Sequence, residues 1–170
     1  MNHFGEISYL THIGRPTVAL INNATTAHLG GLGSVDGIAR AKGEIFEGLA
    51  ANGTAVINAD DDFAPLWRSL AGNRAILTFG LSKDADISAS FKLHTERSEM
   101  QLRTPLGEAA VDLPVAGQHN IANALAATAA AVAMGITLPY IVAGLQSFAG
   151  VKGRLQQKRG INGALIIDDT

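Results

Sequence analysis

Residues 17–46, TVALINNATTAHLGGLGSVDGIARAKGEIF, contain the strand, loop and helix around which we expect the chain to fold. The β-branched run 17–21 predicts a short buried strand. A loop with His28 and several glycines follows it. Ser34 predicts the N-cap of a helix, and Asp36 lies in the first turn, where a carboxylate interacts favourably with the helix dipole. A strand, a loop and a helix in this order are typical of an α/β sheet.

The predicted helix carries a lysine on its apolar face. Lys42 lies at the centre of a stripe made by Val35, Ile38, Ile45 and Leu49. Such a lysine either extends its ammonium group to water or is held in apolar surroundings. In the second case the pKa of the amine falls and its neutral form becomes reactive. A neutral amine can add carbon dioxide to form a carbamate, whose two hard oxygen atoms suit Mg²⁺. The sequence leaves both interpretations open.

The composition describes one well-packed domain. The chain has 170 residues, of which 47% are hydrophobic and 16% charged, with a formal net charge of -2 and no cysteine. This charge provides no general attraction to nucleic acid or acidic membranes, and the missing cysteines exclude disulfides and thiolate zinc sites. No apolar stretch is long enough to span a membrane, and the first residues do not resemble a signal peptide. We therefore expect a cytoplasmic monomer.

The rest of the chain predicts an α/β fold: a three-layer, mostly parallel sheet flanked by helices, with a small antiparallel β insertion. The two-residue alternation of apolar and polar side chains places this insertion at about residues 84–115. The remaining predicted elements are helices over 6–13, 63–70, 124–133 and 138–148, buried strands over 54–57 and 75–80, and a final core strand within 164–170.

Polar side chains follow two of these elements. Residues 58–61, Asn-Ala-Asp-Asp, come directly after a strand, where open α/β sheets bind ligands. The alternative, which we favour, is that Asp60, Asp61 and Asp62 cap the next helix.

Asn120 and Asn123 are one helical turn apart, and a carboxamide can pair with the amino group and neighbouring ring nitrogen of adenine. His119 could stack on the base. An N-cap and one buried amide would explain the same asparagines.

Several short motifs in this sequence resemble the central, ATP-binding domain of the Mur ligases. The motifs are Asn-Asn-Ala-x-x-Ala-His-Leu at 22–29, Gly-Ser at 33–34 and Ala-Lys-Gly-Glu-Ile-Phe at 41–46, with a second match at 117–127 and a third at 151–156. The resemblance implies a P-loop-type central domain in which His28 and a carbamylated, catalytic Lys42 bind Mg²⁺. It implies further that His119, Asn120 and Asn123 hold the adenine of ATP. Arg154 would reach the phosphates as a second catalytic residue, and Asp169 would approach the ribose.

The resemblance is strongest to the branch of the family that adds D-alanyl-D-alanine to UDP-N-acetylmuramoyl-tripeptide. It implies an ATP-dependent amide ligase that forms an acyl phosphate during peptidoglycan synthesis. Three alternatives remain open. The first is another Mur-type ligase, such as the diaminopimelate-adding, folylpolyglutamate or cyanophycin enzymes. The second is a non-catalytic nucleotide-binding module, and the third is a structural domain in which Lys42 extends to solvent.

No G-x-x-x-x-G-K-[ST] motif for phosphate binding occurs in these residues. We therefore interpret residues 1–170 as one domain that is a fragment of the family's central domain. The N-terminal substrate domain, the phosphate-binding loop and the C-terminal domain would then belong to other parts of the same protein. We expect this piece alone to have negligible ligase activity.

Overall fold

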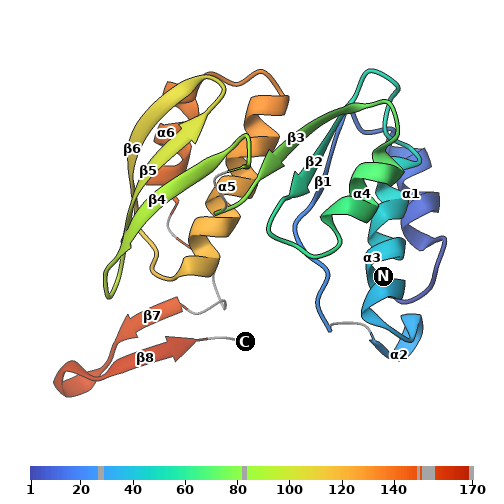
Figure 1. Ribbon diagram of the computed structural model, residues 1–170. Helices are drawn as coiled ribbons and strands as arrows, with labels where there is room; N and C mark the ends of the chain where they lie inside the picture. Colours follow the sequence, from blue (N-terminus) through green and yellow to red (C-terminus); the bar gives the residue numbers. More distant parts are fainter. Residues whose placement is uncertain (27–28, 82–83, 149, 151–155, 169–170) are drawn as a thin grey trace.

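The computed structural model describes residues 1–26, 29–81, 84–148, 150 and 156–168, apart from the side chains of 29, 156–159, 165, 167 and 168 (Figure 1). Its elements are α1 (Glu6–Gly14), β1 (Val18–Ile21), α2 (Leu29–Leu32), α3 (Val35–Gly43), the 3₁₀ turn η1 (Glu44–Phe46), β2 (Thr54–Asn58), α4 (Ala64–Ala71), β3 (Ala75–Phe79), β4 (Ser88–Leu93), β5 (Ser98–Thr104), β6 (Gly107–Leu113), α5 (Gln118–Ala133), α6 (Leu138–Gln146), β7 (Gln156–Arg159), the 3₁₀ turn η2 (Ile161–Gly163) and β8 (Leu165–Asp168).

A parallel sheet of order β1-β2-β3 lies at the centre of the fold. Helices α3 and α4 cover one face and α5 covers the other, which gives the three layers expected from the sequence (Figure 1). Successive side chains of β1 point to opposite faces: Ala19 and Ile21 pack towards α3 and α4, whereas Val18 and Leu20 pack towards α5. Because apolar residues occupy both faces, the strand appears in the sequence as a continuous hydrophobic run.

The layer of α3 and α4 is held by one large buried aromatic residue. Trp67 is fully buried, and its indole Nε1 donates a hydrogen bond to the carbonyl oxygen of Ala39 at 2.9 Å. Gly43 allows the two helices to approach closely, since a Cβ atom at that position would lie 2.3 Å from Cδ1 of Leu70. Helix α3 is thereby fixed against α4.

The antiparallel insertion is confirmed as a separate sheet of order β4-β5-β6. Side chains of β5 alternate between buried and exposed along its whole length, so that Met100 and Leu102 point inwards. Helix α5 lies between this sheet and the parallel one (Figure 1), and Ile121, Leu125 and Ala129 on α5 are fully buried. The two sheets therefore share one hydrophobic core through α5.

Two predictions from the sequence need correction. The apolar stripe that contains Lys42 is not one continuous helix, because α3 ends at Gly43 and the chain tightens into η1 before it reaches Leu49. The final strand is not a core strand. Among the described residues, β8 pairs antiparallel with β7 alone, and Ile166 in it is 51% exposed. An apolar run predicts a strand, but it does not predict which strand becomes its partner.

No helix in the described part of the chain combines the length and apolar character needed to cross a bilayer.

Candidate functional site

The loop that leaves β1 is held by β2, by α3 and by the turn between β2 and α4. It lies at the carboxyl ends of β1 and β2, which pair in parallel up to Ile21↔Ile57. The backbone of each of three consecutive residues is bonded to a side chain: the oxygen of Asn22 accepts from Nδ2 of Asn58 at 2.8 Å, the oxygen of Asn23 accepts from Nζ of Lys42 at 2.6 Å, and the nitrogen of Ala24 donates to Oδ2 of Asp61 at 2.9 Å. This bonding fixes the start of the loop that leads to His28.

Lys42 is half-buried at the last turn of α3. Its helix starts where the sequence predicts, because Oγ of Ser34 accepts a hydrogen bond from the nitrogen of Gly37 at 3.0 Å. Burial lowers the pKa of the Lys42 ammonium, and the negative charge of Asp61 opposes this effect in part. The ammonium group is bonded to the β1 loop, and this is not the geometry of a lysine that extends freely to water.

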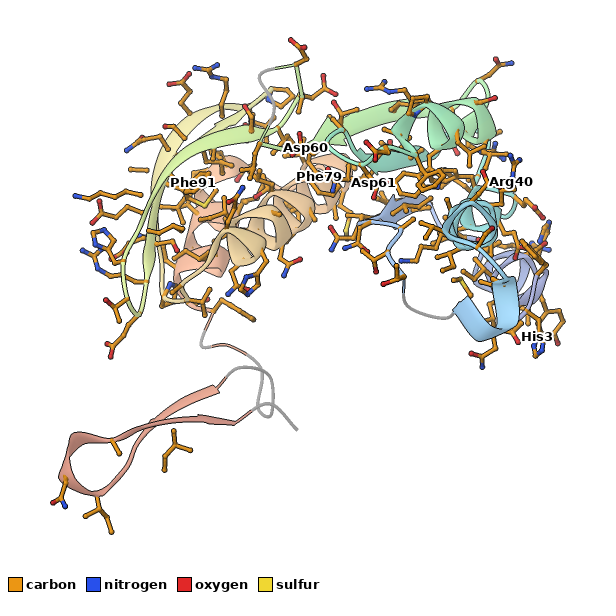
Figure 2. All side chains as sticks on the ribbon, turned by 60° about the horizontal axis from the view of Figure 1, so that its bottom comes forward. His3, Arg40, Asp60, Asp61, Phe79 and Phe91 are labelled. Atoms are coloured by element: carbon orange, nitrogen blue, oxygen red, sulfur yellow. The ribbon has the colours of Figure 1, made fainter. Side chains whose placement is uncertain are left out.

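The aspartates after β2 bind backbone amides, but the capping interpretation is wrong, because the N-cap of α4 is Phe63 and α4 has no side-chain cap hydrogen bond. Oδ1 of Asp61 accepts from the nitrogen of Phe63 at 2.9 Å, just before α4 begins, while its other oxygen holds Ala24. Asp60 accepts from the nitrogen of Leu81 after β3. Both carboxylates lie near the middle of the molecule beside Phe79, whereas Arg40 and His3 lie towards its periphery (Figure 2). Asp61 therefore stabilises the turn before α4 and tethers the β1 loop at once.

At the start of α5 the two asparagines each use one half of their carboxamide within the protein. Nδ2 of Asn120 donates to the oxygen of Ala116 at 2.7 Å, and Oδ1 of Asn123 accepts from Nδ2 of Asn22 at 3.2 Å. Both residues line a groove of about 480 Å³ between α5 and α6, whose other walls are mostly apolar. His119 is exposed, and its ring lies over Gly117, where a Cβ atom would be 2.7 Å from it.

Three predicted site residues, His28, Arg154 and Asp169, lie outside the described residues. The proximity of His28 to Lys42 and the nucleotide contacts of Arg154 and Asp169 thus stay predictions. Within the described ranges, no group of three or more His, Asp or Glu side chains is arranged to hold a metal ion. The histidines at 3 and 12 form local contacts, to Glu6 Oε1 at 3.0 Å and to the Ser8 oxygen at 2.7 Å.

Sequence reasoning missed the side chains of Asn22 and Asn58 as structural clamps. Their only signal in the sequence is that each follows or ends a buried strand. Polar residues at the carboxyl ends of neighbouring parallel strands meet at one edge of the sheet, and this rule applied to both would have suggested the contact.

The sequence matches a known protein family over most of its length. The Mur ligase middle domain family matches residues 1–131, which include β1, Lys42, the clamp residues and most of α5. The chain belongs to the Mur ligase family. This Mur ligase domain is 43% identical, over 99% of its length, to the UDP-N-acetylmuramoyl-tripeptide–D-alanyl-D-alanine ligase of Escherichia coli (strain K12), and it covers 38% of that relative.

Solved structures show the same fold. A crystal structure of MurF from Acinetobacter baumannii superposes with a TM-score of 0.95 at 43% identity, covering 100% of this chain and 37% of that one. MurF from Thermotoga maritima in complex with ADP superposes with a TM-score of 0.84 at 26% identity, covering 99% of this chain and 39% of that one. This Mur ligase domain therefore spans about two fifths of the length of these relatives, and the predicted family and fold class are confirmed.

Proposed function

We propose that this domain binds ATP and Mg²⁺ in a cytoplasmic enzyme that joins D-alanyl-D-alanine to UDP-N-acetylmuramoyl-tripeptide through an acyl phosphate. The hydrogen bond from Lys42 to the oxygen of Asn23 carries the proposal, since it sets a desolvated amine against the loop that leads to His28. The 43% identity to a ligase named for this reaction, over 99% of the chain, supports the choice of substrates. Segments outside these 170 residues would bind the substrates and complete the phosphate site.

The chemistry of Lys42 fits a magnesium site only after modification. An ammonium group repels a cation, whereas a carbamate on the same nitrogen offers two hard oxygens. Burial favours the neutral amine that the modification needs. Carbamylated Lys42 and His28 would then hold the ion. Bound Mg²⁺ would supply positive charge between the acceptor carboxylate and the triphosphate, which at about 4 Å repel by ~4 kcal/mol at an effective dielectric of 20.

The two asparagines of α5 fit an adenine ring as a pair. With Nδ2 of Asn120 and Oδ1 of Asn123 already bonded inside the protein, Asn120 keeps an oxygen to accept and Asn123 keeps an amide group to donate. This combination complements the amino group of adenine and its neighbouring ring nitrogen. His119 would stack on the base, Asp169 would contact the ribose, and Arg154 would bind the phosphates as they transfer.

The experiment examines Lys42 in the full-length natural protein. Mass spectrometry should detect a bicarbonate-dependent gain of one carbon dioxide on Lys42 that acid removes. Lys42→Ala should lower ligase activity by roughly a hundredfold or more, with partial rescue by formate or acetate. Lys92→Ala, which changes an exposed lysine of β4, is the matched control and should keep full activity. Normal turnover in Lys42→Ala would refute the role of this lysine.

A further inference from the structure

We infer that Asn22 is a positioning residue for nucleotide recognition, because its side chain determines which half of the Asn123 carboxamide faces the bound base. The contact between them is the hydrogen bond from Nδ2 of Asn22 to Oδ1 of Asn123 at 3.2 Å. The inference rests on the adenine contact proposed for Asn123 and adds to it a residue from a different element.

Asn22 is itself held in place. It directly follows β1, whose last residue Ile21 pairs with Ile57 of β2 and is 3% exposed. Its backbone oxygen accepts a hydrogen bond from Nδ2 of Asn58 at 2.8 Å. With the strand and the carbonyl fixed, the side chain of Asn22 reaches α5 from a rigid base. The donor that it presents to Asn123 therefore has a defined position.

The bond removes an ambiguity that every asparagine carries. A carboxamide can turn by half a rotation and exchange its acceptor oxygen for its donor nitrogen at little steric cost. Asn22 donates, so the oxygen of Asn123 turns towards it and the NH₂ group turns away. Among the residues that the structure describes, this NH₂ group has no hydrogen-bond partner, and Asn123 is exposed at the groove between α5 and α6.

Asn120 is fixed in the opposite sense. Its Nδ2 donates to the oxygen of Ala116, so its Oδ1 is the half that remains available. The two side chains together present one acceptor and one donor along a single face of α5. Adenine needs this order, because its amino group donates and the adjacent ring nitrogen accepts. If Asn123 turned over, two acceptors would meet the base and the ring nitrogen would face an oxygen.

The same loop also connects the nucleotide base to the candidate metal site. Asn22 contacts Asn123, and the next residue, Asn23, accepts the hydrogen bond of Lys42. Adjacent residues therefore carry the group that orients the adenine contact and the group that binds the ammonium of Lys42.

The test compares two replacements of Asn22 by ADP titration calorimetry on the full-length natural protein. Asn22→Ala removes the donor and lets the Asn123 amide turn freely, so ADP affinity should fall by about fivefold, the typical loss for one hydrogen bond. Asn22→Asp has the same shape but only accepts, so it would draw the NH₂ group of Asn123 inwards. Affinity should then fall by roughly tenfold or more, although a hydrogen bond between the two residues persists.

Three controls separate orientation from other effects. Thr25→Asp adds the same charge to an exposed position of the loop and measures the electrostatic contribution alone. Asn123→Ala measures the base contact itself. The double variant Asn22→Ala/Asn123→Ala should bind ADP no more weakly than Asn123→Ala, because Asn22 acts only through Asn123. Thermal unfolding of each variant shows whether it is folded.

The outcomes distinguish the orienting role of Asn22 from the adenine contact proposed for Asn123. If Asn22→Asp binds ADP as tightly as the unmodified protein, or if the losses of the double variant add, the orienting role is wrong while the adenine contact stands. If Asn123→Ala itself leaves ADP affinity unchanged, the adenine contact assigned to Asn123 is wrong, and the orienting role of Asn22 is then wrong as well. A loss in Asn22→Asp that exceeds both Asn22→Ala and Thr25→Asp supports the inference.

Discussion

Among the single residues of this domain, Lys42 is subject to two opposing electrostatic effects. Burial disfavours its charged form, whereas the carboxylate of Asp61 favours it, and the net result is a lowered pKa. Asp61 is held in place by two backbone amides, those of Ala24 and Phe63. The charge that opposes the effect of burial on this pKa therefore comes from a residue that also shapes the β1 loop.

We predict that Asp61→Asn lowers the pKa of Lys42 further. The replacement removes the negative charge that raises this pKa and leaves the burial that lowers it. More of the amine is then neutral at any pH below its pKa, so Lys42 should react faster with cyanate at pH values near 8. Mass spectrometry of the labelled peptide measures the rate. Exposed Lys92 is the internal control, and an unchanged or slower reaction at Lys42 would contradict the assigned electrostatics.

At the scale of secondary-structure elements, α3 illustrates how a short helix is made stable. It has 9 residues, and isolated helices of this length are marginal in water. Its stability comes from the Ser34 cap, from the pair between Arg40 Nε and Asp36 Oδ2 at 2.7 Å, and from packing against Trp67. The pair is exposed, so the cap and the packing contribute more.

Ser34→Ala is predicted to lower the free energy of unfolding by about 1 kcal/mol, because the amide of Gly37 loses its acceptor. Urea denaturation measures the change. The matched variant Ser34→Asp keeps an acceptor at the N-cap and should retain most of the stability. Equal losses in the two variants would show that the serine contributes something other than the cap.

For the whole molecule, α5 is the element that joins the two sheets. Its buried side packs against the parallel sheet and the antiparallel insertion at once, and small residues such as Ala129 allow this close approach. The same helix presents Asn120 and Asn123 at its amino end. Packing of the core and placement of the proposed adenine site thus depend on one helix.

A larger side chain at Ala129 should therefore disturb both halves of the fold. We predict that Ala129→Leu costs about 1–3 kcal/mol, since this position is fully buried and cannot accommodate added volume. Ala127→Leu places the same side chain on the exposed side of α5 and should change stability little. Urea or thermal unfolding of the two variants gives the comparison, and equal stability would show that the core near Ala129 can expand.

Local patterns predicted the elements well for a clear reason. The strand at β1, the cap at Ser34 and the alternation through β4, β5 and β6 depend on residues a few positions apart. The candidate chemistry at Lys42 also follows from its place on an apolar face. The end of α3 at Gly43 was not predicted, because the apolar spacing continues into η1 although the helix does not.

The sequence by itself determined the α/β class, the family and the antiparallel insertion, all of which follow from short-range patterns and recognisable motifs. It left two interpretations of Lys42 open, and burial in the folded chain decided between them. Only the tertiary structure decided that β8 pairs with β7 and that Asn22 meets Asn123. Those two asparagines are 101 positions apart, and nothing in the spacing of their neighbours indicates that they touch. The contact between Asn22 and Asn123 arises only when α5 packs on the parallel sheet and brings its amino end beside the carboxyl end of β1.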